Sequence, residues 1–235
     1  MRMFPTSFPI TRQFLDSSAV IELDTLIIAA PGARKYEINQ NPVPDRENIL
    51  KLLSQIAHCL RPSRVILFST IDVYKHPLNV DEDVEISTDL TYGGNRALFE
   101  IELQKLVPTL LVRRLPGLFG SGLRKNLIFD LVNSRHDQLS NYSPDSIFQY
   151  IHIEEAIKLS LNPSFALCEI LNVVTPPVQV SEFADLPMNS ELERFEYNVL
   201  TKFDPRNYFF ERSEVIKSIQ NFIHKEKNAR LARGD

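Results

Sequence analysis

The sequence predicts a doubly wound α/β fold built on a parallel sheet, and three observations support this prediction. Short, continuous apolar runs recur at residues 26–30, 65–68 and 110–112, as expected for strands buried on both faces of a sheet. Segments with helical periodicity separate these runs and are long enough for right-handed crossovers. Finally, 43% apolar and 24% charged residues are ordinary values for a globular protein.

In the first half of the chain, each expected element has its own boundary signal. The first apolar run stops at Pro31-Gly32, so this strand should end at a ligand-facing loop. Arg61-Pro62 ends the first long helix, and Pro108 stops the second. The expected order is a strand at 26–30, a helix from Pro44 to Leu60, a strand at 65–68, a helix at 90–107 and a strand at 110–112.

Beyond Gly122 the pattern changes to shorter elements, which prolines interrupt. We therefore divide the chain into a core, residues 1–122, and a mixed segment, residues 123–235, that returns to the sheet and forms a smaller lobe. The second segment should contain a helix at 126–133, a strand at 148–153, a helix at 154–161, a strand at 169–174 and a helix at 213–225.

Composition argues against several classes of function. The net charge of −4 makes a nucleic-acid partner unexpected, since phosphate binding needs a clustered basic surface. No apolar run approaches the ~20 residues that span a bilayer, and we expect a cytoplasmic protein. Cys59 and Cys168 lack disulfide spacing and are interpreted as free thiols. The five histidines show no metal-ligand spacing, so no metal site is predicted.

Thr70, Tyr92 and Arg96 form the strongest catalytic pattern. Tyrosine has a pKa of about 10, so it needs a nearby cation to act as a base at neutral pH. Arg96 follows Tyr92 by one helical turn, and Thr70 ends a buried strand from which it can hydrogen-bond a reacting oxygen. Tyr208 and Arg212 have the same spacing without this strand context, and we interpret them as a surface pair.

Five segments, in matching order, resemble the extended short-chain dehydrogenase/reductase superfamily, in particular its NAD-dependent epimerase/dehydratase branch that acts on nucleotide sugars. The resemblance implies a Rossmann-like dinucleotide-binding core, truncated at its N-terminus, and a small C-terminal substrate lobe. The segments are Asp24–Ala30, Phe68–Tyr74, Tyr92–Glu100, Arg114–Gly120 and Phe148–Glu155.

The resemblance also implies roles for individual residues. Thr70 corresponds to the substrate hydrogen-bonder, Tyr92 to the general acid/base, and Arg96 to a lysine that in the family also holds the nicotinamide ribose. Asp72 provides a carboxylate beside Thr70, and Asn126 faces the expected substrate cleft, so both are candidates for binding substrate.

The implied cofactor is NAD or NADP. Arg34 and Lys35 are candidates for its pyrophosphate, and a solvated basic turn is the alternative interpretation of both. Gly117-x-x-Gly120-x-Gly122 has the spacing of a phosphate loop, but its position after the tyrosine helix suits a substrate or nicotinamide loop better. The cofactor-binding candidates are Ala29, Ala30, Pro31, Arg34, Lys35, Pro116 and Gly117.

Three departures from the family pattern weaken the assignment. Only 25 residues, none of them glycine, precede Leu26, whereas the family begins with a strand, a glycine-rich turn and a helix. Either the cofactor site is incomplete, the sequence starts inside a longer protein, or another chain supplies the missing strand. Arg96 replaces a lysine, and its planar group cannot mimic a compact ammonium. Phe148 stands in place of a nucleotide-binding arginine, and Ile71 in place of a dehydratase aspartate.

Two functions remain open from the sequence. The first is an NAD(P)-dependent epimerase or reductase acting on a nucleotide-linked or related sugar, in surface-polysaccharide synthesis. The second is a catalytically degenerate relative that serves as a binding or regulatory subunit. In either case a homodimer is expected, because family members pair through the tyrosine helix and the helix before it.

Overall fold

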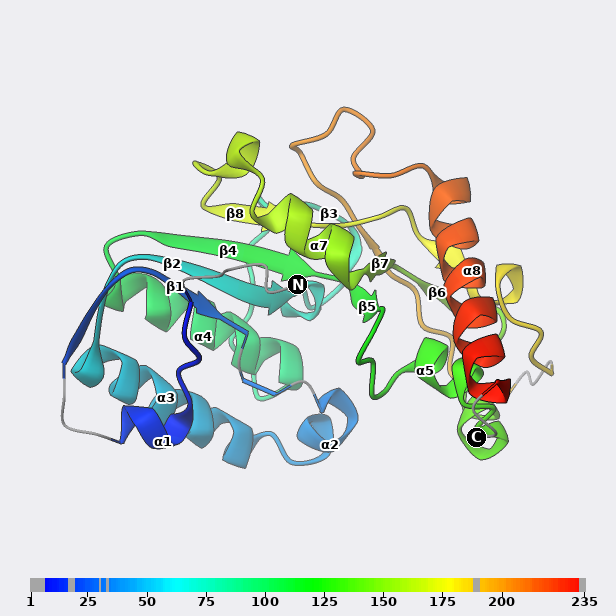
Figure 1. Ribbon diagram of the computed structural model, residues 1–235, viewed down its shortest axis with the longest axis horizontal. Coiled ribbons are helices and arrows are strands. Elements are labelled where there is room, and N and C mark those ends of the chain that lie inside the picture. Colours follow the sequence, from blue (N-terminus) through cyan, green and yellow to red (C-terminus); the bar gives the residue numbers. More distant parts are fainter. Residues whose placement is uncertain (1–6, 17–19, 30, 33, 188–190, 233–235) are drawn as a thin grey trace.

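A four-stranded parallel sheet forms the centre of the computed structural model, which describes residues 7–16, 20–29, 31–32, 34–187 and 191–232. The strand order is β1-β2-β4-β8. Helices α3 and α4 cover one face and α7 lies over the other, so the predicted doubly wound fold is confirmed (Figure 1). These elements are β1 (Ile21–Ile28), α3 (Val43–Cys59), β2 (Leu60–Thr70), α4 (Tyr92–Leu106), β4 (Leu110–Leu115), α7 (Ile153–Ser160) and β8 (Ile170–Asn172).

The second strand is longer than its apolar run predicts. It begins immediately after helix α3, at Leu60, and includes Pro62, which pairs in register with Leu23 of β1. Polar residues at 61, 63 and 64 interrupt the apolar pattern. The first half of β2 is therefore set by pairing with β1, which a search for continuous apolar runs does not detect.

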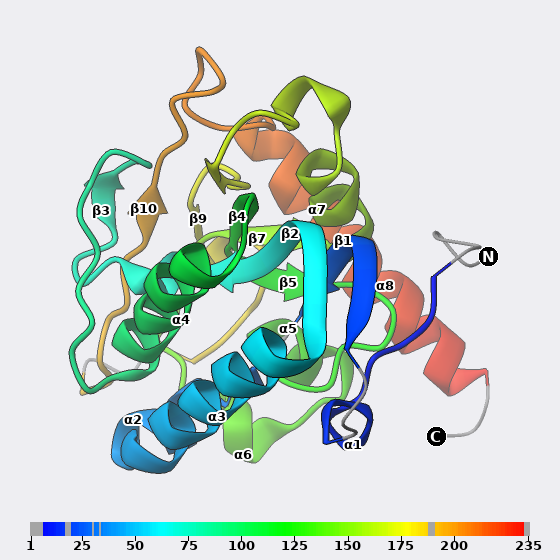
Figure 2. The same ribbon diagram turned by 90° about the vertical axis from the view of Figure 1, so that its left-hand side faces the viewer.

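Two small two-stranded sheets connect the second half of the chain to this core, and a third, β6–β9, lies within the second half. The pair β3–β10 is parallel, as is β5–β7, whereas β6–β9 is antiparallel. Figure 2 shows β3 and β10 side by side, away from β1. The strands are β3 (Leu78–Val80), β5 (Gly117–Phe119), β6 (Ile147–Phe148), β7 (Tyr150–His152), β9 (Val178–Gln179) and β10 (Asn198–Val199).

Two main apolar clusters stabilise the two halves. One lies between the sheet and helices α3 and α4, around Ile49, Val65 and Leu103. The other is formed by α5, α8 and β7, around Leu127 and Ile219. The remaining elements are α1 (Arg12–Leu15), α2 (Lys35–Gln40), α5 (Leu127–Val132), α6 (His136–Leu139), α8 (Arg212–Leu231) and the 3₁₀ turns η1 (Ile71–Val73), η2 (Pro163–Phe165) and η3 (Val180–Glu182).

Candidate active site

Thr70 and Asp72 mark the carboxyl end of β2. The Thr70 hydroxyl accepts a hydrogen bond from the backbone N–H of Asp72 at 3.2 Å and donates one to Asp72 Oδ2 at 3.2 Å. These bonds cap the short turn η1 and orient the carboxylate. In open α/β sheets, ligands bind at this end of the strands, so both residues lie where the sequence predicts chemistry.

Tyr92 begins helix α4 directly against this turn. The approach is close, since a Cβ on Gly93 would lie 1.8 Å from the backbone oxygen of Asp72. Only glycine fits there. The Tyr92 side chain is 5% exposed. Burial raises its pKa, and the charge of Asp72 raises it further, while the cations Arg96 and Lys35 act in the opposite direction.

Arg96 lies against the Tyr92 ring, with its guanidinium carbon 4.7 Å from the ring centre. The same side chain forms an ion pair with Asp45, at 3.1 Å to each carboxylate oxygen, and donates to the backbone oxygen of Gly32 at 2.7 Å. The predicted neighbourhood of Arg96 and Tyr92 is therefore present. Most of the hydrogen-bonding capacity of the guanidinium is used by Asp45 and the loop after β1.

Lys35 joins the site from helix α2. Its ammonium donates to Asp72 Oδ1 at 2.6 Å and to the hydroxyl of Tyr197, which in turn donates to Asp72 Oδ1 at 2.9 Å. Burial would lower the pKa of Lys35, but the Asp72 carboxylate and Tyr197 outweigh burial and raise it. Burial and Asp72 raise the pKa of Tyr197 to about 12. Lys35, Asp72 and Tyr197 are called the Lys35 network below.

Tyr197 is not among the residues predicted from the sequence. No catalytic motif surrounds it, and its contacts come from residues far away in the chain. The sequence signal is the alternation of Phe195, Tyr197 and Val199 with polar residues, which is typical of a strand, although β10 itself begins only after Tyr197, at Asn198. The ring of Phe148 stacks on both Phe195 and Tyr197, at centre distances of 6.1 and 5.9 Å. Phe148 therefore supports the Tyr197 ring.

A cavity of about 300 Å³ opens beside the Lys35 network. Neither Thr70 nor Tyr92 lines it, whereas two other tyrosines, Tyr74 and Tyr197, do. The wall consists of Lys35, Asn39, Asp72, Val73, Tyr74, Lys75, Pro77, Ser87, Asp89, Thr91, Gly93, Gly94 and Tyr197.

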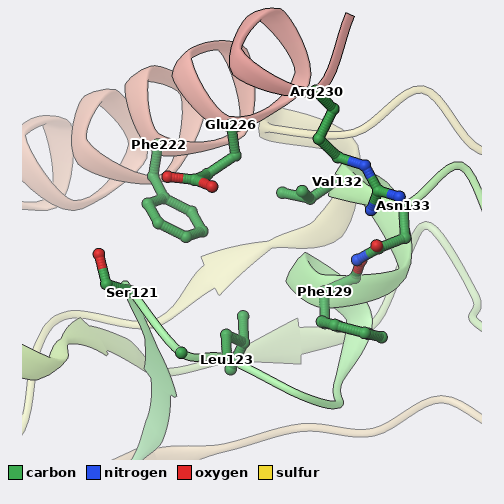
Figure 3. Close-up of a pocket in the computed structure, with 10 residues that line it drawn as sticks. Ser121, Leu123, Phe129, Val132, Asn133, Phe222, Glu226 and Arg230 are labelled. Carbon is green, nitrogen blue, oxygen red and sulfur yellow. The ribbon is translucent and has the colours of Figure 1, made fainter. Parts of the chain in front are cut away.

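A second cavity, of about 260 Å³, lies between helices α5 and α8 (Figure 3). Phe222, Glu226 and Arg230 of α8 face Phe129 and Asn133 across it. None of the predicted site residues lines this cavity.

The other predicted residues have different surroundings. Ala29 and Pro31 follow β1, while Ala30 lies outside the described residues. Arg34 is exposed and pairs with Glu37 at 3.2 Å. The position of Arg34 fits a solvated turn, whereas Lys35 lies in the site.

Pro116 and Gly117 lead from β4 into β5. A Cβ on Gly117 would lie 2.6 Å from the Tyr150 ring, and a Cβ on Gly120 would lie 2.6 Å from Ile153. Packing against β7 and α7 thus accounts for two of the three glycines in this loop. Their spacing alone is not evidence for a phosphate site.

Asn126 caps helix α5. Its side-chain oxygen accepts from the backbone N–H of Phe129 at 3.1 Å, and its amide donates to the backbone oxygen of Leu118 at 2.9 Å. The residue adopts a φ of 94° with a ψ of 173°, a backbone conformation that residues with a side chain rarely occupy. These bonds give Asn126 a structural role, and contact with a sugar stays a prediction.

The surface pairing expected for Tyr208 and Arg212 is absent. Tyr208 instead donates to Asn198, while Arg212 pairs with Glu182. In the part of the chain that the structure describes, no group of three acidic, histidine or cysteine side chains could hold a metal ion. Within the same residues, no helix combines the length and apolar character needed to cross a membrane.

Comparison with solved structures identifies proteins of the same fold. The chain resembles UDP-galactose 4-epimerase (TM-score 0.64, 15% identity, 88% of this chain and 78% of that chain). It also resembles the Bordetella bronchiseptica enzyme WbmG in complex with NAD and UDP (0.63, 13%, 87% and 72%). A third similar structure is TunA, an NAD-dependent NDP-hexosamine 5,6-dehydratase involved in tunicamycin biosynthesis (0.65, 15%, 91% and 79%).

No family model and no curated protein matches the sequence. The likeness therefore rests on three-dimensional structure, and at 13–15% identity it establishes the fold. This chain has the Rossmann-like fold of the NAD-dependent nucleotide-sugar epimerases and dehydratases, as its strand-end and tyrosine-helix motifs predict.

Proposed function

We propose that this protein is an NAD(P)-dependent oxidoreductase of the epimerase or reductase type, acting on a nucleotide-linked or related sugar in surface-polysaccharide synthesis. One observation carries the proposal: Thr70, Asp72 and Tyr92 meet at the carboxyl end of β2, with the cations Arg96 and Lys35 beside them. This combination suits proton exchange with a sugar hydroxyl. The similar structures, several of which contain NAD, support the same kind of chemistry.

In this proposal, each residue has a defined task. Thr70 orients the sugar oxygen through its hydroxyl, and Tyr92 exchanges the proton of that oxygen. The two cations stabilise negative charge on the Tyr92 oxygen, against the opposing effects of burial and Asp72. The raised pKa keeps Tyr92 protonated in the free protein, so it can act as an acid without prior activation.

The residues present fit the reactive end of a nicotinamide dinucleotide. Arg96 Nε is buried and has no hydrogen-bond partner among the described residues, so it could serve a ribose hydroxyl. When bound, the cofactor would accept and return a hydride. Ala29, Pro31, Pro116 and Gly117 would line it.

A degenerate binding subunit is the second candidate, and one observation favours it. Asp45 and Gly32 already engage the Arg96 guanidinium. Arg96 is therefore less available to a cofactor than a free lysine would be. In this case the chain would bind a partner, such as a second copy through α3 and α4, and would not catalyse a reaction.

Calorimetric titration with NAD(H) and NADP(H) separates the two candidates. The enzyme proposal predicts binding of at least one dinucleotide and turnover of a UDP-sugar. It also predicts that Tyr92→Phe retains binding while turnover falls by about 100-fold or more. Tyr208→Phe is the matched control and should change neither. Absence of dinucleotide binding at millimolar concentration would refute the enzyme proposal.

A further inference from the structure

The cavity between helices α5 and α8 lies apart from the residues of the proposed function. It has a volume of about 260 Å³, just below the ~300–1,000 Å³ typical of small-molecule pockets. None of the described residues assigned above to the substrate, the proton transfer or the dinucleotide lines it. The cavity therefore has room for a small molecule at a place distinct from the proposed chemistry.

Apolar side chains form much of the wall of this cavity. They come from α5, from α8 and from the loop after β5, and they are Phe129, Val132, Phe222 and Leu123. Figure 3 shows the Phe222 ring directed into the space, with Leu123 across from it. An edge contact with Phe119, at a centre distance of 5.6 Å, holds the Phe222 ring in place. These side chains can pack against the apolar body of a ligand.

Two opposite charges stand on the same wall. Glu226 and Arg230 follow Phe222 along α8 at four-residue spacing, so the three side chains share one face of the helix. In Figure 3 all three are directed from α8 into the cavity. Ser121 and Asn133 add a hydroxyl and an amide to the same lining. The cavity thus combines an apolar wall with one anion, one cation and neutral polar groups.

The protein itself neutralises neither charge. A glutamate four residues before an arginine is a favourable spacing for a helical ion pair, yet Glu226 and Arg230 form no ion pair with each other or with any other described residue. Elsewhere in this structure a helical pair does form, between Lys158 and Glu155 at 2.6 Å. Glu226 and Arg230 are both half-buried, so each loses part of its hydration without gaining a partner. A ligand with the opposite pair of charges would compensate both.

From this arrangement we propose that the cavity binds a small zwitterion with an apolar body, which is the chemistry of a free apolar α-amino acid. Arg230 binds the ligand carboxylate through its planar pair of donors, and Glu226 accepts from the ligand ammonium. Both charged groups of an α-amino acid are attached to one carbon, so they can reach two side chains that lie one helical turn apart. The rings of Phe129 and Phe222 hold the apolar side chain. The binding does not depend on the proposed function.

L-Phenylalanine is the probe, and a ligand-observed NMR titration of the full chain without dinucleotide measures its binding. A ligand of this size should bind with a Kd of about 1 mM or below. 3-Phenylpropionate lacks the ammonium and 2-phenylethylamine lacks the carboxylate, so each should bind at least about tenfold more weakly.

Substitution of the two charges shows whether the probe binds in this cavity. Arg230→Met and Glu226→Gln each remove one charge and keep most of the side chain, so each should weaken L-phenylalanine binding by about tenfold or more. Lys225→Met is the matched control, because it removes a cation from an exposed residue of α8 outside the cavity lining. This control should bind L-phenylalanine like the parent.

Three results would overturn the inference. The first is no binding of L-phenylalanine to the parent at about 10 mM, and the second is equal affinity of the parent for all three probes. The third is binding by both Arg230→Met and Glu226→Gln within a factor of about three of the parent. Circular dichroism checks that each variant is folded, and if one is not, the three probes on the parent decide.

Discussion

Replacement of Arg96 by methionine tests the idea that this residue is an integral part of the folded core. Its side chain is 5% exposed, and that of its partner Asp45 is 12% exposed. Methionine fills a similar volume but removes the ion pair and the hydrogen bond to the Gly32 oxygen. Asp45 would keep one side-chain donor among the described residues, the amide of Asn95 at 2.8 Å.

The burial of this ion pair sets the expected loss of unfolding free energy. Removing one partner of a buried ion pair costs about 3–5 kcal/mol of unfolding free energy, because the remaining charge stays desolvated. Arg96→Lys keeps the charge and loses the planar two-point contact, so about 1–2 kcal/mol is expected. For a chain of this size, the methionine variant should melt roughly 10 °C below the parent.

Urea denaturation followed by far-ultraviolet circular dichroism measures these differences, since the chain has no tryptophan for fluorescence. The slope of unfolding free energy against urea should stay constant. In the double variant Asp45→Asn/Arg96→Met the loss should be smaller than the sum of the single losses, because no buried charge is left unpaired. A methionine variant within 1 kcal/mol of the parent would refute this account of Arg96.

Three further predictions follow from packing and titration. Gly93→Ala should prevent folding or lower the unfolding free energy by several kcal/mol, because the new Cβ would lie 1.8 Å from a backbone oxygen. The control Gly32→Ala adds a Cβ that meets nothing within 4 Å, so it should melt like the parent. Equal melting temperatures of the two variants would contradict this prediction. Glu100→Gln should lower the unfolding free energy measured in urea by about 3–5 kcal/mol, since Arg114 is 2% exposed and pairs with Glu100 at 2.7 Å. A change below 1 kcal/mol would argue against a buried ion pair here. Burial and the neighbouring Asp72 carboxylate raise the pKa of Tyr197 from 10 in the unfolded chain to about 12 in the folded protein. The folded protein therefore has its full unfolding free energy below pH 10. This free energy should fall by about 2–3 kcal/mol as the pH rises toward 12 and Tyr197 ionises. Urea midpoints should fall across this range, and less steeply in Tyr197→Phe; equal slopes would count against the raised pKa.

The sheet was predictable because its strands carry their own signals. The apolar runs at 65–68 and 110–112 lie within β2 and β4, and Pro108 lies between the end of α4 and the start of β4. Strand boundaries that are set by pairing with a neighbouring strand could not be predicted as well from the local sequence. Residues 60–64 extend β2 because β1 lies beside them, and no local pattern records that contact.

The residues of the candidate site also differ in how well the local sequence predicts them. Thr70 and Tyr92 come from local motifs that end a strand and begin a helix, so the sequence alone identifies them. Lys35 was predicted only as a pyrophosphate contact or a solvated residue, because its ion pair with Asp72 spans 37 positions. Tyr197 was missed because its role depends on contacts 125 and 162 positions away, which leave no trace in local spacing.

The Lys35 network also has a consequence for the order of events during synthesis. Lys35 and Asp72 leave the ribosome early, while Tyr197 follows 162 residues after Lys35. Domains fold largely from the N-terminus as the chain emerges, and long-range contacts form late. The central strands β1, β2 and β4 can therefore pair before the network closes. A nascent chain arrested before residue 197 would carry the Thr70 and Tyr92 motifs without Tyr197, and its Lys35–Asp72 ion pair would lack its third member.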